Sequence, residues 1–287
     1  MKIATMTFLY GKDRLGRVLR NHLTSLREWQ TITPDESWLA VEPEGPDDDT
    51  PEAARELCEP LGVKVIRVTP KEADPYWNKA RGINHAIRAS DPSMDILMQV
   101  DADMILHPQH IEKLILHFTL DGHTFYLVKN HSLVDPVEFT GEDPLSIYQE
   151  LADKAVYVPL GCELDPPTTR NPFSPIGPPS KGVGGCQAAM RKWWFKAKGY
   201  DELFTGWTGH DSDLRRRATA SGRKITWAPP GYEMLHQPHP RMCHQTPEEQ
   251  VERQAHTDRL YMHSLRLAAK KRWKRNGKEW GGLPVED

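Results

Sequence analysis

The first 130 residues alternate between two hydrophobic periods, and this alternation limits the fold more than any other feature of the chain. Short apolar runs rich in β-formers occupy residues 3–8, 37–42, 63–68, 95–100 and 124–129. Between them lie segments with apolar residues at three- and four-residue intervals, for example Leu15 to Trp29. This repeat predicts an α/β fold with a mostly parallel central sheet covered by helices.

Punctuating residues give the expected helix boundaries. Thr50 and Pro51 are typical of a helix start, with threonine as the cap and proline at the first helical position. The helix over residues 78–89 is expected to stop before Asp91-Pro92, because a proline disfavours helical torsion angles in the residue before it. A further helix is predicted over residues 108–120.

The pattern changes after residue 130. Residues 135–180 hold nine prolines and little hydrophobic periodicity, which is typical of a long connection rather than of a second folded domain. An ordered α/β pattern returns over residues 183–227. We therefore expect one domain over residues 1–245, with a proline-rich connection over residues 131–181.

The bulk composition excludes several classes of protein. Of the 287 residues 38% are hydrophobic and 27% charged, and the net charge of −3 gives no overall attraction to nucleic acid. The chain has no apolar run of about 18 residues, and its N-terminal residues suit a strand better than a signal peptide, so we expect a cytoplasmic protein without a membrane span. The four cysteines form no motif that would predict a zinc cluster or a disulfide framework.

Two carboxylates, Asp101 and Asp103, directly follow the apolar strand of residues 95–100. They would repel one another in a dry site unless a hard divalent cation lay between them, and carboxylate oxygens suit Mg²⁺ or Mn²⁺. Such an ion can neutralise the charge that develops on a diphosphate leaving group. A solvated turn or a loop cap is the competing interpretation of the same two residues.

A second cluster covers residues 206–214, with the sequence GWTGHDSDL. Its glycines allow the backbone to approach a ligand, Trp207 offers a flat face to a sugar ring, and Asp211 can act as a general base towards a hydroxyl. The competing interpretation is the start of a helix, with Asp211 or Asp213 in the first turn.

The stretch GGCQAAMRKWWFKAKGYDELFTGWTGHDSDLRRRATASG, which contains this cluster, resembles the C-terminal half of family 2 and family 7 glycosyltransferases, including the β-1,4-galactosyltransferases. Asn78-Lys79-Ala80 and the segment DILMQVDADMIL resemble the family 2 nucleotide-sugar half. The resemblance covers about residues 2–130 and 182–240, and its motifs occur in order. It implies the GT-A fold, which is a Rossmann-like sheet, here followed by a basic C-terminal helix.

The resemblance also implies roles for individual residues on the donor side. Asp103 would ligate the metal, Asp101 would approach the metal and the ribose, and His236 falls where several members carry a histidine ligand, with His239 as the competing candidate. The donor-binding set would comprise Thr7, Tyr10, Arg14, Glu42, Asp47, Lys79, Arg81, Asp101 and Ala102. Solvated helix charges are the alternative for Lys79 and Arg81.

On the acceptor side, the resemblance makes Asp211 the catalytic base. The acceptor-binding set would comprise Gly185, Trp207, Gly209 and His210. Two positions depart from the family pattern, because His210 replaces a glutamate and Ser212 replaces an aspartate. In the family those acids often hold the acceptor sugar, so the departures leave the acceptor open.

The C-terminal residues 246–287 form a third feature. Thr246 to Glu249 make a capping box, which predicts a helix running to about Lys274. Seven positive charges follow within Arg266–Lys278, with Trp273 and Trp280 interleaved. A solvated helix end is one interpretation, and a surface for anionic membrane lipid or nucleic acid is the other.

We therefore expect a GT-A catalytic domain with a nucleotide-sugar half over residues 1–130 and an acceptor half over residues 182–245. The expected activity is inverting, metal-dependent transfer of a sugar from a nucleoside-diphosphate sugar, with a UDP-sugar favoured, to a hydroxyl of a glycan, a lipid-linked glycan or a nucleic acid. The expected cofactor is Mn²⁺ or Mg²⁺. The alternatives are transfer to a modified nucleic-acid base, nucleotidyl transfer, and a non-catalytic sugar- or nucleic-acid-binding protein.

Overall fold

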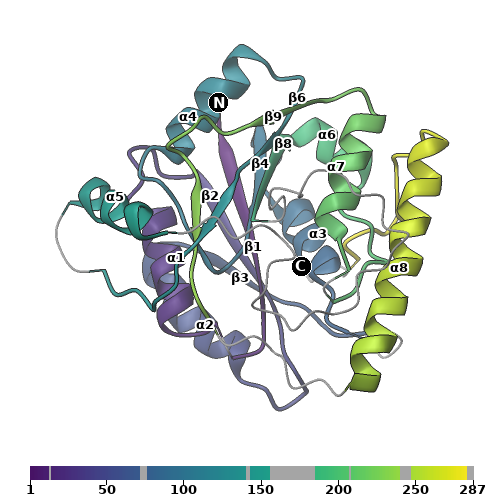
Figure 1. Cartoon of the computed structure of the whole chain (residues 1–287), viewed down its shortest axis with the longest axis horizontal. Helices are drawn as coiled ribbons and strands as arrows, with labels where there is room; N and C mark the ends of the chain where they lie inside the picture. Colours follow the sequence, from purple (N-terminus) through teal and green to yellow (C-terminus); the bar gives the residue numbers. More distant parts are fainter. Residues whose placement is uncertain are drawn as a thin grey trace.

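A seven-stranded sheet forms the centre of the molecule (Figure 1). The computed structural model describes residues 1–12, 14–71, 76–139, 143–155, 185–206, 208–239 and 247–282. The strand order in the large sheet is β3-β2-β1-β4-β8-β6-β9. Its strands are β1 (Ile3–Tyr10), β2 (Glu36–Glu42), β3 (Lys64–Arg67), β4 (Ile96–Val100), β6 (Thr124–Leu127), β8 (Cys186–Met190) and β9 (Lys224–Trp227).

All neighbouring strands in this sheet are parallel except for β8, which runs antiparallel to both β4 and β6. The prediction of a mostly parallel sheet is therefore confirmed, with strands close to their expected bounds. A second sheet has the order β5-β10-β7. Its strands are β5 (Met104–Ile105), β7 (Asn130–Ser132) and β10 (Met234–His236).

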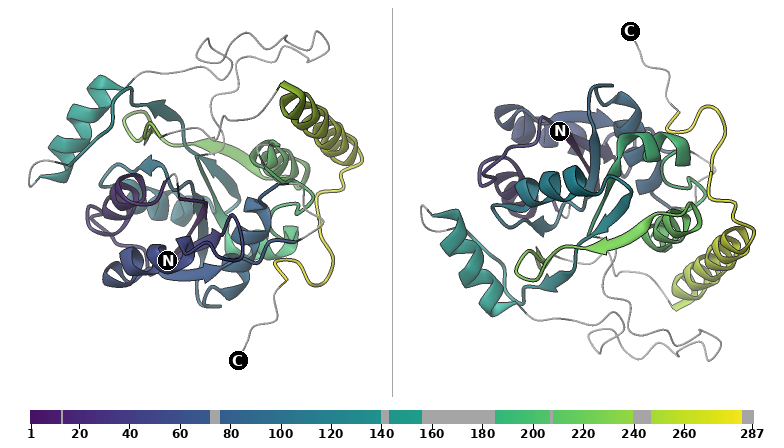
Figure 2. Two further views of the ribbon diagram at one scale, coloured as in Figure 1. Left: turned by 90° about the horizontal axis from the view of Figure 1, so that it is seen from below. Right: turned by 90° about the horizontal axis from the view of Figure 1, so that it is seen from above.

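Helices cover both faces of the large sheet, as the two opposite views of Figure 2 also show. Side chains of β1 alternate between two buried layers: Ile3 and Leu9 pack with one set of helices, Met6 and Phe8 with the other. The first set comprises α1 (Arg17–Arg27), α2 (Thr50–Cys58) and α4 (His110–Leu120). The second comprises α3 (Lys79–Ala89), α6 (Arg191–Ala197) and α7 (His210–Ala220).

Two predicted helix boundaries are wrong. Thr50 is the first residue of α2 rather than its cap, because Asp48 accepts hydrogen bonds from both its backbone N–H and its hydroxyl. The helix α8 (Pro247–Ala269) ends before the expected Lys274, and Lys271 takes a positive φ of 53° just beyond it. The remaining helical elements are α5 (Pro144–Lys154) and the 3-10 turn η1 (Glu59–Leu61).

The chain after α8 returns to the sheet instead of continuing as a solvated helix end. Trp280 is only 8% exposed and belongs to the hydrophobic cluster shared by α3, α6 and α7. Arg275 is also buried, and its guanidinium lies 3.0 Å from Asp201 and 3.5 Å from Asp213. We call residues 270–282 the C-terminal strap.

Among the described residues, no helix has both the length and the apolar character needed to cross a membrane.

Candidate active site

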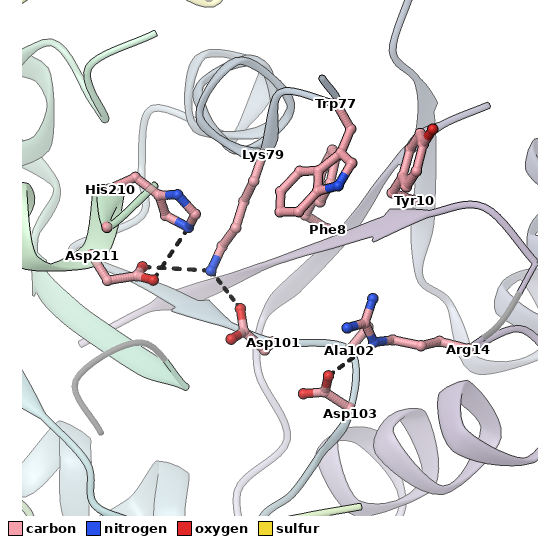
Figure 3. A pocket seen from close by; sticks show the side chains of 11 residues that line it. Phe8, Tyr10, Arg14, Trp77, Lys79, Asp101, Ala102, Asp103, His210 and Asp211 are labelled. Atoms are coloured by element: carbon pink, nitrogen blue, oxygen red, sulfur yellow. Dashed lines mark hydrogen bonds and ion pairs between the residues drawn. The ribbon is translucent and has the colours of Figure 1, made fainter. Parts of the chain in front are cut away.

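The carboxyl ends of β1 and β4 lie side by side because the two strands are parallel neighbours, and a cavity of about 220 Å³ opens beyond them (Figure 3). The start of α3 and the start of α7 complete its wall. The lining residues are Phe8, Tyr10, Arg14, Trp77, Lys79, Asp101, Ala102, Asp103, Gly209, His210 and Asp211. A site at this edge is the position expected for a ligand of a mostly parallel sheet.

A tight turn separates the two carboxylates that follow β4. The N–H of Asp101 donates to the carbonyl of Gly185 at 3.0 Å, and the N–H of Met104 donates back to the carbonyl of Asp101 at 3.2 Å. As a result the two side chains point to different parts of the cavity (Figure 3). Asp101 reaches Lys79, whereas Asp103 reaches Arg14.

Asp103 lies in a cluster with His236 and His239 whose candidate ligand atoms are all within 4.8 Å of one another. The Nε2 atoms of His239 and His236 are 3.1 Å and 3.7 Å from Oδ2 of Asp103. The other oxygen, Oδ1, is buried and has no hydrogen-bond partner among the residues that the structure describes. One carboxylate and two imidazoles around an unsatisfied oxygen are a donor set that can hold a divalent metal ion. Both His236 and His239 reach Asp103, so the geometry is compatible with either or both of them as ligands.

The small sheet brings these histidines to a residue more than a hundred positions away. β10 pairs antiparallel with β5, so His236 lies opposite Met104, directly after Asp103. The N–H of Gln237 then donates to the carbonyl of Asp103 at 2.9 Å. The side chain of Gln237 is buried and bonded to α1 through Asn21 at 2.9 Å and through the carbonyl of Val18 at 3.0 Å.

Arg14 occupies the other side of Asp103, with its Nε 2.9 Å from Oδ2. Burial acts to raise the pKa of Asp103, but the hydrogen bond to His239 and the charges of His236 and Arg14 outweigh it and hold that pKa well below its usual range. Asp103 is therefore ionised, as a metal ligand must be.

Lys79 links the first carboxylate to the second cluster. Its ammonium lies 2.6 Å from Asp101 and 3.5 Å from Asp211, and its side chain is 7% exposed (Figure 3). Gln99 also donates to Asp101 at 2.7 Å. Burial raises the pKa of Asp101 to about 6 even though Lys79 opposes the shift, with the neighbouring charge of Asp211 adding to it.

Asp211 lies in the first turn of α7 and is surrounded by donors. His210 approaches Oδ2 at 3.2 Å, and the hydroxyl of Tyr200 donates to Oδ1 at 3.3 Å. The side chain of Gln187 fixes the backbone by donating to the carbonyl of Asp211 at 3.1 Å. Burial alone would raise the pKa of Asp211, but His210 and Lys79 outweigh it and hold this pKa at about 2.

Three aromatic rings form the opposite wall of the cavity. Trp77 lies 5.8 Å from the ring of Phe8 and stacks on Tyr10 at 5.9 Å with an interplanar angle of 30°. The sequence prediction found Tyr10 but missed Phe8 and Trp77. The signal was present for both, since Phe8 is near the end of a predicted strand and Trp77 directly precedes a predicted helix start.

Four of the predicted donor-binding residues do not line the cavity. Thr7 is buried beside His22 with a 3.2 Å contact between its hydroxyl and Nε2. Glu42 is buried too, where it accepts the N–H of Asn78 at the start of α3 and faces Arg81 at 3.8 Å. Asp47 is exposed on the turn between β2 and α2. Their predicted contacts with a nucleotide stay predictions.

The glycines of the predicted acceptor set play different structural parts. Gly209 lines the cavity and takes a φ of 80°, a left-handed conformation that lets α7 begin there. Gly185 instead packs against Asn130, whose amide would lie 2.3 Å from an added Cβ. Trp207 lies outside the described residues.

Comparisons with known proteins agree with this architecture. The family described as glycosyl transferase family 2 matches residues 14–155, and the family described as N-terminal domain of galactosyltransferase matches residues 167–240. No curated protein matches the sequence. Together the two family matches cover most of the residues that line the cavity.

Several solved structures share the fold. The crystal structure of S. aureus TarS 1–349 is 13% identical with a TM-score of 0.55, covering 94% of this chain and 65% of that one. The same protein in complex with UDP-GlcNAc is 12% identical with a TM-score of 0.55, covering 94% and 66%. A longer TarS structure is 13% identical with a TM-score of 0.54, and only 39% of it is covered.

At these identities the structural likeness shows the fold alone, and the chain spans no more than about two thirds of the TarS structures. The sequence matches follow one another along the chain in the order of the two halves of the fold, with the family 2 match first. The chain therefore has the GT-A fold, and over most of its length its sequence is similar to glycosyltransferases of the family 2 and family 7 type.

Proposed function

We propose that this protein is a glycosyltransferase that moves a sugar from a UDP-sugar to an acceptor hydroxyl with inversion at the anomeric carbon, and that it needs Mn²⁺ or Mg²⁺. One observation carries the proposal: Asp103, which lies in a cluster with His236 and His239, and the carboxylate of Asp211 line the same small cavity (Figure 3). The complexes of TarS with UDP and with UDP-GlcNAc, on the same fold, support the choice of donor.

The cavity has distinct parts for the pieces of such a donor. The wall of Phe8, Tyr10 and Trp77 offers flat apolar faces on which a nucleobase can stack. Arg14 and Lys79 line the cavity, and both lie close to carboxylates. A diphosphate beside them would receive charge-assisted hydrogen bonds.

Asp103, His236 and His239 would hold the metal. When bound, the ion would stabilise the negative charge of the departing nucleoside diphosphate. Arg14 already neutralises part of the charge of Asp103, at 2.9 Å. Asp101 stands apart from the cluster and is bonded to Lys79 and Gln99, so we assign it to the donor rather than to direct ligation.

Asp211 would take the proton from the acceptor hydroxyl as that oxygen attacks the anomeric carbon. Its carboxylate is ionised, partly exposed and on the cavity wall, which are the requirements for a base in this position. An inverting transfer needs such a base on the acceptor side and charge stabilisation on the leaving-group side. The separate positions of Asp211 and of the Asp103 cluster meet that need.

Two variants test these assignments separately. Asp103→Ala should weaken Mn²⁺-dependent binding of UDP, measured by titration calorimetry, by at least about tenfold. Asp211→Asn should leave that binding nearly unchanged while transfer falls by about 10² to 10⁴. Equal UDP affinity of Asp103→Ala and wild type with Mn²⁺ would contradict the metal site, and full activity of Asp211→Asn would contradict the base.

The acceptor requires a screen rather than a single assay. UDP release from UDP-sugars should be measured with Mn²⁺ alone and then with a glycan, a lipid-linked glycan or DNA. An increase of UDP release with one acceptor class identifies that class. If no UDP-sugar is turned over with any acceptor or by slow hydrolysis, the proposal of a UDP-sugar transferase is wrong.

A further inference from the structure

His210 is the first residue of α7 and lines the cavity, yet both of its ring nitrogens are withheld from a ligand. The residue is 5% exposed. Its Nε2 lies 3.2 Å from Oδ2 of Asp211. Its Nδ1 is buried and makes no hydrogen bond within the described part of the chain. Neither ring nitrogen is therefore available to an incoming acceptor.

The contact between His210 and Asp211 is not a general property of a helix start. Neighbouring residues on a helix point in directions about 100° apart, so their side chains do not normally meet. Here the left-handed Gly209 begins the helix, and the edge-on ring of Tyr200, 6.0 Å away, packs against the imidazole. Together they leave the ring turned towards the carboxylate (Figure 3).

The burial of Nδ1 indicates which nitrogen carries the proton. A buried N–H without an acceptor costs more than a ring nitrogen lone pair without a donor. The arrangement with least cost places the hydrogen on Nε2, where it is donated to Asp211, and leaves Nδ1 as a bare acceptor. The bond then holds one oxygen of the carboxylate in a fixed direction.

We propose that His210 is a positioning residue that acts through Asp211 and does not bind the acceptor itself. This rests on the proposed function, in which Asp211 is the base. The contact of Nε2 with Oδ2 at 3.2 Å constrains the carboxylate rotamer from one side, while Tyr200 and Lys79 contact Oδ1 at 3.3 Å and 3.5 Å. His210 thereby departs from its expected place in the acceptor-binding set.

The proposal predicts a specific split of the kinetic constants. His210→Ala should lower kcat by about 10- to 100-fold, the usual loss for a hydrogen bond to a charged group. The acceptor KM should change by less than about threefold, because no acceptor contact is removed. His210→Gln should recover much of kcat, because its amide N–H can still donate to Asp211.

A double-mutant cycle separates action through Asp211 from direct action on the acceptor. In the background of Asp211→Asn, the further change His210→Ala should lower the residual rate by less than about twofold. A residue that bound the acceptor independently would instead show its full effect in both backgrounds.

Two controls keep a folding defect apart from a loss of positioning. Every His210 variant should bind UDP with Mn²⁺ as the wild type does, since His210 contacts neither Asp103 nor its histidines. His117→Gln is a matched histidine variant on α4, hydrogen-bonded to Thr124 at 2.8 Å and not part of the cavity lining, and it should keep wild-type kinetic constants.

The outcomes are distinct. A rise of at least tenfold in acceptor KM with unchanged kcat in His210→Ala would overturn the proposal and make His210 an acceptor ligand. Failure of His210→Gln to exceed His210→Ala would overturn it too. If instead Asp211→Asn is fully active, the proposed base is wrong, whereas an inactive Asp211→Asn beside an unaffected His210→Ala refutes only the present inference.

Discussion

Trp280 packs the C-terminal strap against the sheet and its helices, so Trp280→Ala tests whether residues after α8 belong to the core of the fold. The indole is 8% exposed and meets Phe195 edge-on at 5.6 Å between ring centroids. The backbone carbonyl of Trp280 accepts a 2.7 Å hydrogen bond from Arg88 on α3. The next residue, Gly281, donates its N–H to Glu202.

The cost of the substitution follows from the buried area. A tryptophan buries about 150–250 Å², which at about 25 cal/mol per Å² amounts to roughly 4–6 kcal/mol as an upper estimate. Measured Trp→Ala changes in protein cores cost about 3–5 kcal/mol. We expect Trp280→Ala to lower the free energy of unfolding by about 3–5 kcal/mol.

Urea denaturation followed by circular dichroism measures this loss, provided that the unfolding is reversible. Lys278→Ala is the matched control, because Lys278 is an exposed residue of the same strap and should change stability by less than about 0.5 kcal/mol. If Trp280→Ala lowers the free energy of unfolding by less than about 1 kcal/mol, the strap is not part of the core, and a solvated basic tail is the better description.

Three further predictions concern single side chains. His239→Ala should weaken Mn²⁺-dependent UDP binding, measured by calorimetry, by at least about tenfold. The loss should exceed that of His236→Ala, because His239 is the nearer and more buried partner of Asp103. A larger loss in His236→Ala would contradict this geometry. Tyr10→Ala should cost about 1–3 kcal/mol of UDP binding through lost stacking, and an unchanged dissociation constant would exclude a base at that wall. Burial raises the pKa of Cys58 to about 12, so iodoacetamide at pH 8.5 should alkylate it in urea but leave it unmodified in the folded protein, as mass spectrometry can follow.

The sequence predicted the strands of the large sheet and the longer helices of the first 130 residues, because each buried face there repeats with its own period, but it did not predict the short β5 and η1. Ile3, Met6 and Leu9 alternate as a strand buried on both sides requires. The glycine at residue 209 also agrees with the structure, because its backbone takes a positive φ that glycine readily adopts. The antiparallel insertion of β8 between β4 and β6 was not predictable, because strand order depends on pairing between distant segments.

The paired histidines show what local patterns cannot supply. The sequence leaves His236 and His239 as alternative metal ligands, because a short interval in sequence does not show whether two side chains face the same point. The answer depends on β10 pairing with β5 and on Gln237, which is anchored to Asn21 of α1. The buried face of α1 includes Asn21, a polar group that needs a hydrogen-bond partner.

The two carboxylates of the Asp101-Ala102-Asp103 motif therefore contact different groups. Asp103 faces the histidine cluster and Arg14, and its low pKa keeps it ionised. Asp101 faces Lys79, which also contacts Asp211, so a charged residue of α3 joins the donor side of the cavity to the proposed base. A buried ammonium shared by two carboxylates cannot be displaced from one without changing the other. A donor phosphate that draws Lys79 away from Asp211 would make that carboxylate more basic, which couples donor binding to activation of the acceptor.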